Sequence, residues 1–546
     1  MRKPEFFSMI RKKEITKEQF FRDFRAGVGV AIISLPLSIA LGISSGVTPQ
    51  EGLITAVVAG LITALLGGSP VQIGGPTGAF VVVVFGIVQK YGIEGLIIST
   101  FMGGIILILL GVLRLGSLIK FIPYPITVGF TAGVAAILAT TEIKDFFGLH
   151  MGKVTGGFFS KWIAYITHMN TMNYVTVLVG VGSILIIVFW PRVNKSIPGS
   201  LVALIAATII VKLLGLHVET IGSTFGNIPA SIPMPKIPTM NLELIKELIG
   251  PAITIALLSA ISSLLSAVVS DETLGQKHNS NTELIAQGVS NIVSALFGGI
   301  PSAGVVARTT ANIRGGGRTP IAGIVNAVLL LIIMLVLMPL AKFIPLTTLG
   351  AILLVVAYKM TKWKTMYAIS KGPKSDLLLL AVTFILTVVF NVVVAVEVGM
   401  AIAALGFMIK MSDTLEIEEL EKENIELDRA INMDLVGGRI RIKELKGALF
   451  FGTASVFKDS MRRIEYENVD VLIFRMRNIN DLDITAIKML DSLNVACELY
   501  KVKFILTGLN QSNAKVIEKL KGEDITMFAN IEEGIEEANR ILNLKG

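Results

Sequence analysis

The stretch LLGGSPVQIGGPTGAF, residues 65–80, has a counterpart in LFGGIPSAGVVARTTAN, residues 296–312. Both begin with leucine, an apolar residue, two glycines, a variable residue and proline, and both continue as a glycine-containing apolar run. Glycine and proline interrupt regular helices. Each stretch therefore predicts a segment that stops and restarts within an apolar region.

The composition places these stretches in a membrane protein. The chain has 546 residues, of which 53% are hydrophobic, and a mean hydropathy of +0.72. This is too apolar for a soluble globule of average make-up. Segments of about 20 apolar residues, enough to cross a bilayer, recur until about residue 410. We therefore expect a polytopic α-helical membrane protein, placed in the cell membrane.

Hydropathy predicts about fourteen spans, of which the third and tenth are too short or too broken for ordinary crossings. The lysines and arginines of the connections concentrate on one side when the N-terminus is placed inside. This satisfies the positive-inside rule and predicts that both termini are cytoplasmic. The spans are expected near 24–46, 52–67, 76–90, 96–115, 122–140, 173–190, 198–215, 247–269, 282–297, 305–313, 320–341, 346–359, 375–391 and 393–410.

The two glycine-rich stretches also relate the two halves of the chain. They fall in spans two to three and nine to ten, and the alignment carries Thr77 onto Arg308 without a gap. A second pair, KFIP at 120–123 and at 342–345, opens spans five and twelve. Seven spans per half give the halves opposite orientations in the membrane. The sequence therefore predicts a 7+7 inverted-repeat transporter.

The broken segments have the features of a binding site. GGP at 74–76 would break one helix and start a half-helix, and Pro301, Ala303 and Gly304 would play the same part before the second half-helix. Two helix N-termini that point at one cavity attract an anion because each carries partial positive charge. The alternative is that these glycines and prolines mark only close packing or kinks, which are common in membrane helices.

Arg308 strengthens the expectation of an anion. It lies in the apolar run VVARTTAN, where a buried guanidinium costs at least several kcal/mol unless it is paired or hydrated. The alternative is that Arg308 extends to the cytoplasmic face or pairs with a carboxylate. Arg314 and Arg318, beside GGG, are expected to set topology instead.

The C-terminal tail has a different pattern. We expect a cytoplasmic arm at 1–23, the transport domain at 24–411, a linker at 412–436 and a soluble α/β domain at 437–546. The single cysteine, Cys497, can form no intramolecular disulfide, which fits a reducing compartment. The expected strands are RIRIKELKG, ALFFGTAS, VDVLIFRM and VKFILTGL, separated by helices.

Three stretches resemble the sulfate permease (SulP) family of anion transporters with a C-terminal STAS domain. They are VQIGGPTGAF at 71–80, FIPYPITVGFTAG at 121–133 and NSNTELIAQGVSNIVSALFGGIPSAGVVARTTANIRGGGRTPIAG at 279–323. The resemblance implies a core domain, carrying the broken segments, that moves against a gate domain in an elevator-like cycle. It also implies substrate-binding positions at Ser38, Thr77, Gly78, Ala79, Phe80, Ala307, Arg308 and Thr309.

The sequence departs from this family in span eight. Relatives often carry a carboxylate there, and the matching position is Ser262. Ser266 shares its helix face and supplies only a hydroxyl. A serine cannot take up a proton or neutralise sodium, so we expect no coupling to either cation through this position. The remaining candidate acids are Asp271, Glu272 and Glu142.

The tail loop NINDLDITAIKML resembles the STAS loop that precedes a helix. Thr485 matches the position that is phosphorylated in anti-sigma antagonists. Simple helix capping by Asp483 is the favoured alternative. The resemblance implies a homodimer and a regulatory protein partner at this domain, with Thr485 as the candidate regulatory residue.

Enzymatic chemistry has little support. The four histidines show no metal-ligand spacing, and neither HExxH nor a Walker motif occurs, so no cofactor or metal is expected. The net charge of +8 belongs to the cytoplasmic loops and the arm and requires no nucleic-acid partner. We expect a secondary carrier of sulfate, bicarbonate or a dicarboxylate. An uncoupled anion conductance and, more distantly, a nucleobase carrier remain open.

Overall fold

The computed structural model describes two compact units, Met1–Met400 and Ala401–Gly546. The first contains the membrane helices as far as the middle of the last one, the second contains the rest of that helix and the α/β domain, and each has its own apolar core. Lys120 and Phe121 of the first KFIP and much of the expected linker lie outside the described residues. The description covers the chain except residues 1–2, 118–121, 153–156, 195–196, 240–241, 391, 422–424, 426–432, 435, 463–467, 480–481, 522–524 and 546.

The first half of the membrane unit follows the predicted order of spans. Its helices α2, α3, α5, α7 and α8 match spans one, two, five, six and seven. Spans three and four are the two helical segments of α4, which are separated by a non-helical break at Gly92 (φ 69°, ψ −171°). The elements are α1 (Glu5–Arg11), α2 (Lys17–Ser44), α3 (Pro49–Leu66), β1 (Gly74–Gly75), η1 (Gly78–Phe80), α4 (Val81–Val112), α5 (Tyr124–Phe147), α6 (Phe158–Thr167), η3 (Met169–Thr171), α7 (Tyr174–Val193), α8 (Gly199–Leu213) and α9 (Ile221–Phe225).

The second half repeats this order. Helix α12 is the broken tenth span, and the helices before and after it match spans eight, nine and eleven to fourteen. Within the described part of the chain, eight helices are long and apolar enough to cross a membrane. The elements are α10 (Leu242–Leu274), α11 (Ser280–Leu296), β2 (Ala303–Gly304), α12 (Val306–Arg314), α13 (Ile321–Ala341), α14 (Leu346–Met360), α15 (Trp363–Ser370), α16 (Lys374–Val389) and α17 (Val392–Ser412).

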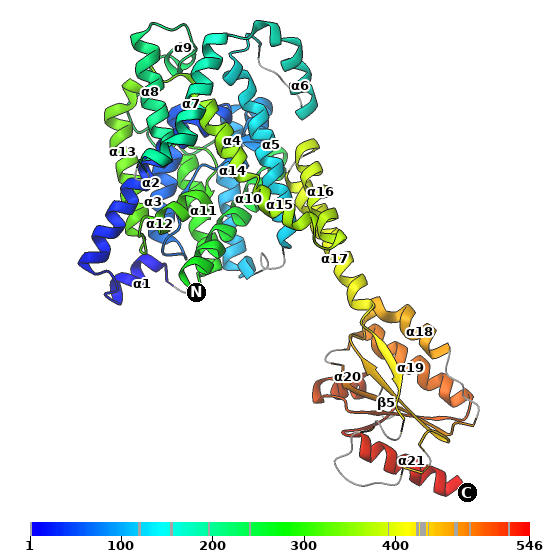
Figure 1. Ribbon diagram of the computed structural model, residues 1–546. Helices are drawn as coiled ribbons and strands as arrows, with labels where there is room; N and C mark the ends of the chain where they lie inside the picture. The colour runs from blue at the N-terminus through cyan, green and yellow to red at the C-terminus, as the bar shows by residue number, and fades with distance from the viewer. Residues whose placement is uncertain are drawn as a thin grey trace. The chain divides into compact units, whose positions relative to one another are not determined.

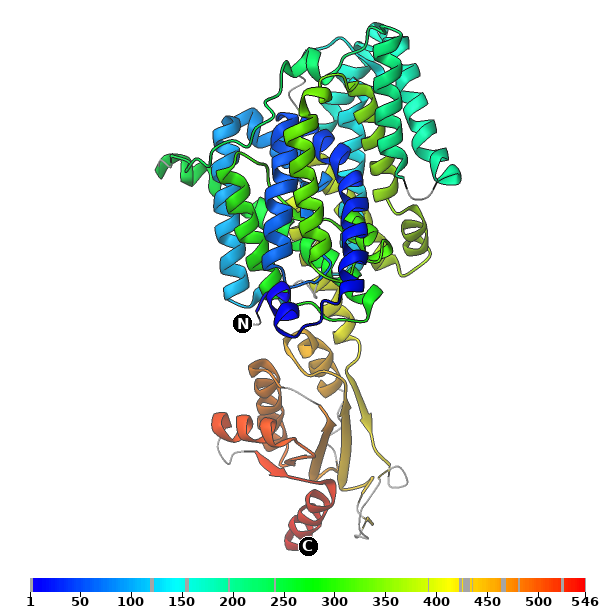
Figure 2. The same ribbon diagram turned by 90° about the vertical axis from the view of Figure 1, so that its left-hand side faces the viewer.

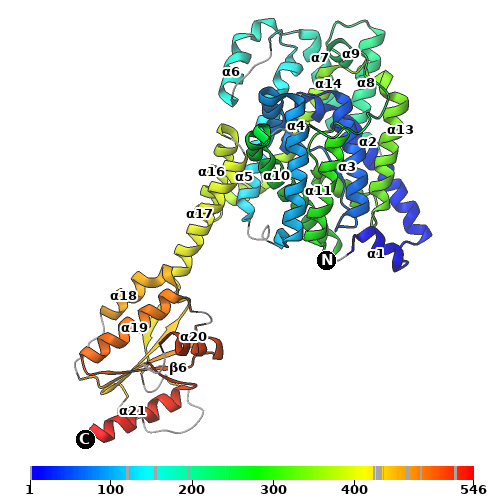
Figure 3. The same ribbon diagram turned by 180° about the vertical axis from the view of Figure 1, so that it is seen from behind.

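Two groups of helices surround the broken segments. Helix α13 lies between α2 and α3, as Figure 2 shows in green and blue. On the other side, α4 packs along α10 and α11 (Figure 3). Helices α4 and α11 meet at Gly104 and Gly288, where a Cβ atom on either residue would lie 2.6 Å from the carbonyl oxygen of the other. Small residues allow membrane helices to pack this closely.

The second unit is a five-stranded sheet with helices on both faces. The strand order is β3-β4-β5-β6-β7, and only β3 is antiparallel to its neighbour. One face is covered by α18, α19 and α20 and the other by α21 (Figure 1). The elements are β3 (Glu416–Glu419), β4 (Ile440–Lys446), η5 (Phe451–Thr453), α18 (Ala454–Arg462), β5 (Val471–Asn478), α19 (Ile484–Leu499), β6 (Lys503–Thr507), α20 (Gln511–Lys521), β7 (Thr526–Phe528) and α21 (Ile531–Lys545).

One expected strand is wrong. ALFFGTAS, residues 448–455, forms η5 and the start of α18. The backbone N–H of Phe451, which a strand would use for pairing, donates instead to the Asp483 carboxylate at 2.9 Å. The hydroxyl of Thr453 accepts from the Phe450 N–H at 3.0 Å and closes the turn.

Candidate functional site

The two broken segments meet in a short antiparallel strand pair. Gly74 of β1 pairs with Gly304 of β2, and Gly75 pairs with Ala303. The N–H of Val305 extends the pairing by donating to the carbonyl oxygen of Ile73 at 2.9 Å. The half-helices η1–α4 and α12 begin just after these strands. Segments from opposite halves of the chain therefore place two helix N-termini beside one strand pair.

The repeated GG phrase is the turn that leads each span into its strand. At the end of α3, the N–H groups of Gly68 and Ser69 donate to the Glu283 carboxylate at 2.9 and 3.2 Å. At the end of α11, the N–H of Ile300 donates to the Thr55 hydroxyl at 2.7 Å. Each turn is thus held by a side chain from the other half of the chain.

Arg308 lies inside this arrangement and is only 1% exposed. Its Nη2 donates to the Ser38 hydroxyl of α2 at 3.2 Å. Its Nε and Nη1 have no hydrogen-bond partner, and it forms no ion pair, among the described residues. Nη1 lies beside Gly75 (φ 149°), where a Cβ atom would be 2.6 Å away. The guanidinium therefore retains donors that a small anion could use.

Thr309 belongs to the scaffold of the site. Its hydroxyl accepts from the N–H of Ile73 at 3.1 Å and from the Ser266 hydroxyl at 3.2 Å. Two predicted site residues, Thr309 and Ser266, thus contact each other. Ser262 is half-buried one turn earlier on α10.

The remaining predicted positions lie at the start of the two half-helices. The Thr77 hydroxyl accepts from the Ala79 N–H at 3.5 Å and so starts η1. Gly78 faces Leu138 of α5 and Met360 of α14, at 3.4 and 3.6 Å from an added Cβ atom. The other two predicted positions differ in exposure, because Phe80 is buried and Ala307 is exposed.

A polar scaffold around the strand pair was missed from the sequence. Asn291 of α11 accepts from the N–H of Ser302 at 2.9 Å and donates to its carbonyl oxygen at 3.0 Å. The hydroxyl of Ser259 donates to the same carbonyl oxygen at 2.7 Å. The sequence does contain a pattern that could have predicted this scaffold, namely one acid and two amides within the apolar run TELIAQGVSN. Buried polar groups require hydrogen-bond partners, so such residues indicate a polar network. The other members are Gln72, Ser263, Glu283, Gln287 and Ser290.

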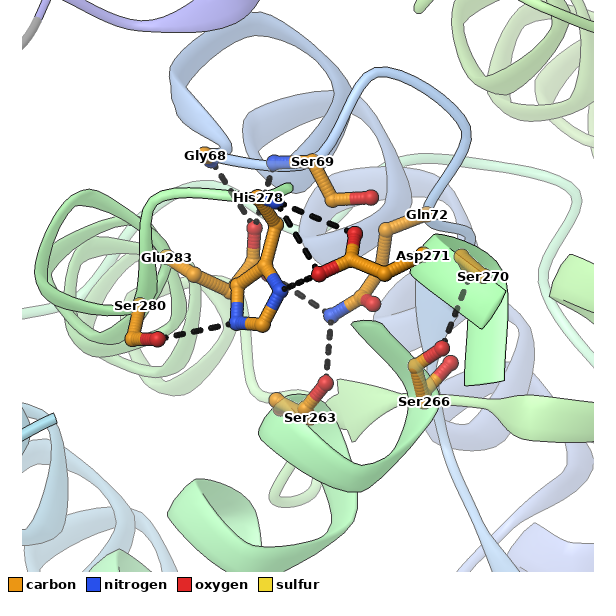
Figure 4. A network of polar contacts seen from close by, with 10 residues as sticks. All are labelled: Gly68, Ser69, Gln72, Ser263, Ser266, Ser270, Asp271, His278, Ser280 and Glu283. Carbon is orange, nitrogen blue, oxygen red and sulfur yellow. Dashed lines mark hydrogen bonds and ion pairs between the residues drawn. The ribbon is translucent and has the colours of Figure 1, made fainter. Parts of the chain in front are cut away.

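Two of the candidate acids have partners. The Glu142 carboxylate on α5 is buried and accepts from the Ser44 hydroxyl on α2 at 2.5 Å. Asp271 accepts from His278 Nδ1 at 2.7 Å, and Ser280 lies 2.9 Å from His278 Nε2 (Figure 4). No group of three or more histidines, cysteines or acids in the described ranges could hold a metal ion.

In the second unit, the capping interpretation of the Thr485 loop has a geometric basis. The Asp483 carboxylate accepts from the N–H of Ala486 at 2.7 Å and starts α19. Thr485 is half-buried in the first turn of that helix.

On the same helix, Cys497 is fully buried, and burial raises the pKa of its thiol to about 12.

The fold and the paired broken segments define a helical membrane transporter with a STAS domain. The sulfate permease family matches residues 20–383, and the STAS domain matches residues 435–538. The chain belongs to the sulfate permease family, whose members are transporters rather than enzymes.

Relatives and solved structures agree with this assignment. "Putative sulfate transporter YvdB" of Bacillus subtilis (strain 168) is 35% identical over 93% of this chain and 95% of that protein. "Bicarbonate transporter BicA" of Picosynechococcus is 31% identical over 93% of each chain. The solved structure of SLC26A9 has the same fold, with a TM-score of 0.86 at 19% identity over 99% of this chain and 93% of that chain. The BicA transmembrane domain has a TM-score of 0.62 at 30% identity and covers 71% of this chain and 98% of that chain.

Proposed function

We propose that this protein is a secondary active transporter of small anions such as sulfate, bicarbonate or a dicarboxylate. The observation that carries this proposal is Arg308, whose buried guanidinium has two nitrogens without a partner among the described residues. A buried, unpaired cation beside two helix N-termini favours an anionic ligand. The names of the BicA and YvdB relatives support the same substrate class.

The binding residues in this proposal are those around the strand pair. Arg308 supplies the positive charge, the start of η1 supplies backbone N–H groups, and Ser38 orients the guanidinium. Ser262, one helical turn before Ser266 on α10, would add a hydroxyl that cannot titrate near neutral pH. In an elevator-type cycle, the helices that carry the broken segments would move against α5 and α14. Helix α5 contacts η1, and α14 contacts α2.

Several further features belong to the same proposal. The protein would lie in the cell membrane with both termini in the cytoplasm. The STAS domain would support a homodimer and a regulatory protein partner, with Thr485 as the regulatory position. These features rest on family resemblance and on the distribution of positive residues.

A second function, uncoupled anion conductance, is favoured by Ser262. It lacks the carboxylate through which relatives are expected to couple transport to a cation. Uptake of radiolabelled sulfate, bicarbonate and fumarate into proteoliposomes tests both functions. Carrier activity predicts saturable uptake and counterflow, whereas a conductance predicts voltage-driven flux without counterflow. If none of the three anions moves, the proposed function is wrong.

A further inference from the structure

The strand pair cannot hold its own position. Each strand contributes two residues, and such a short ribbon is not stable alone. Helix side chains supply the missing support. Ser263 of α10 accepts from the N–H of Gly304 at 2.8 Å, and Thr309 accepts from the N–H of Ile73. The position of the site therefore depends on the side chains that surround it.

Gln72 forms the most direct of these supports. Its Nε2 donates to the carbonyl oxygen of Ser263 at 3.2 Å and to Glu283 Oε1 at 2.7 Å. The amide also lies against β2, because a Cβ atom on Gly304 would collide with it. Gln72, two residues before β1, therefore connects a carboxylate on α11 to Ser263 of α10, whose hydroxyl accepts from the N–H of Gly304 in β2.

Glu283 is the centre of this connection (Figure 4). It is fully buried near the start of α11, and its two oxygens receive four hydrogen bonds. Gln72 and Gln287 donate to Oε1 at 2.7 and 2.9 Å, and the N–H groups of Gly68 and Ser69 donate to Oε2. A buried carboxylate is costly unless it is bonded in this way, and each charge-assisted bond is stronger than a neutral one.

We propose that Glu283 is the positioning residue of the anion site. It fixes the turn before β1 and, through Gln72 and Ser263, the backbone of β2. Helix α12 begins two residues after Gly304, so the position of β2 sets the position of Arg308. This inference rests on the proposed function and adds to it a residue that does not contact the anion.

The test compares Glu283→Gln with a matched control. The amide replaces one acceptor with a donor that faces other donors, so β2 should lose its fixed position. We expect the affinity of the purified protein for radiolabelled sulfate or bicarbonate to fall about tenfold or more, the effect of losing one charge-assisted hydrogen bond. Asp23→Asn is the control. Asp23 is also fully buried, and it accepts from the backbone N–H of Arg318 and the hydroxyl of Thr319, which follow the C-terminal end of α12, so its loss should change affinity less than about twofold.

A readout without anion separates this inference from the proposed function. Hydrogen exchange at the amides of residues 302–304 should become faster in Glu283→Gln and stay unchanged in Asp23→Asn. Gln72→Met keeps three of the four hydrogen bonds to Glu283, so exchange at these amides should become faster to a smaller extent. This variant replaces Glu283→Gln in the test if Glu283→Gln does not fold.

Two results would overturn the inference. One is a hydrogen-exchange rate at the amides of residues 302–304 that is unchanged in both Glu283→Gln and Gln72→Met. The other is a lower melting temperature with unaltered anion affinity, which is the behaviour of a residue that only stabilises the fold. If the unmodified protein binds none of sulfate, bicarbonate and fumarate, the proposed function fails, and the exchange measurement still tests the role of Glu283.

Discussion

Arg308 of α12 donates from Nη2 to the Ser38 hydroxyl of α2 at 3.2 Å, across 270 residues of sequence. This bond uses one nitrogen of the guanidinium. The other two have no partner in the part of the chain that the structure describes. Ser38 therefore orients the cation without neutralising it, and the charge remains for a ligand.

Replacement of Arg308 should remove anion binding. We expect Arg308→Ala to weaken binding of radiolabelled sulfate or bicarbonate by at least about tenfold, because charged hydrogen bonds contribute about 1.5–3 kcal/mol each. Lysine would keep the positive charge but lose the planar guanidinium group that can donate two parallel hydrogen bonds, so Arg308→Lys should restore binding only in part. Ser38→Ala should have a smaller effect. Unchanged transport in Arg308→Ala would assign this residue to topology.

Ser262 predicts weak coupling to cations. The unmodified protein should respond little to proton or sodium gradients in proteoliposomes. A carboxylate desolvated in the membrane has a raised pKa and can exchange a proton near neutrality. Ser262→Glu should therefore introduce a pH dependence that Ser262→Gln, its non-titrating control, lacks. Strong gradient-driven accumulation by the unmodified protein would contradict this and direct attention to Glu142 or Asp271.

The Ser44–Glu142 bond predicts an effect on rate. It joins α2 to α5, and in an elevator cycle it must break when these helices move past each other. We expect Ser44→Ala to change the anion exchange rate severalfold, up to roughly tenfold, with little change in affinity. Thr141→Ala is the control, since that hydroxyl donates only within α5. An altered affinity with an unaltered rate would place Glu142 in the binding site instead.

Cys497 should be almost unreactive in the folded protein. Burial raises the pKa of its thiol to about 12, whereas an exposed thiol has a pKa of about 8.5. Maleimide labelling near pH 8 should be slow until denaturant is added, and Cys497→Ser should abolish it. The raised pKa also stabilises the folded domain below about pH 8.5, and this contribution is lost as the pH rises towards 12. Rapid labelling under native conditions would show that α19 opens.

Removal of the second unit should leave the first able to bind. The paired broken segments lie entirely within Met1–Met400 and share its core. A chain that ends at residue 412 should retain anion affinity and change in transport rate, dimerisation or expression. A monodisperse truncation without affinity would show that the STAS domain is needed for the site.

The sequence predicts the helices better than the contacts between them. Hydropathy windows placed the membrane helices near their observed positions, and the repeated GG phrase marked the two broken segments, because both are local signals. The strand pair was not predicted, since two-residue strands leave no pattern. Glu283 was also missed, because its partners Gly68, Ser69 and Gln72 lie more than 200 residues away. The apolar residues of ALFFGTAS led to the wrong prediction of a strand. The backbone N–H of Phe451 donates to the Asp483 carboxylate, which is distant in sequence, and the segment forms a turn.

The pairing of Gly74 with Gly304 has a consequence for biogenesis. The ribosome completes β2 about 230 residues after β1, which at 5–20 residues per second is roughly 10 to 50 s later. During that time the glycine-rich segment after α3 has no strand partner, although its backbone groups need one within a membrane. The first half therefore stays incompletely folded until the second half has been synthesised and inserted. If translation ends prematurely between the two halves, we expect the resulting fragment to be degraded rather than to accumulate in the membrane.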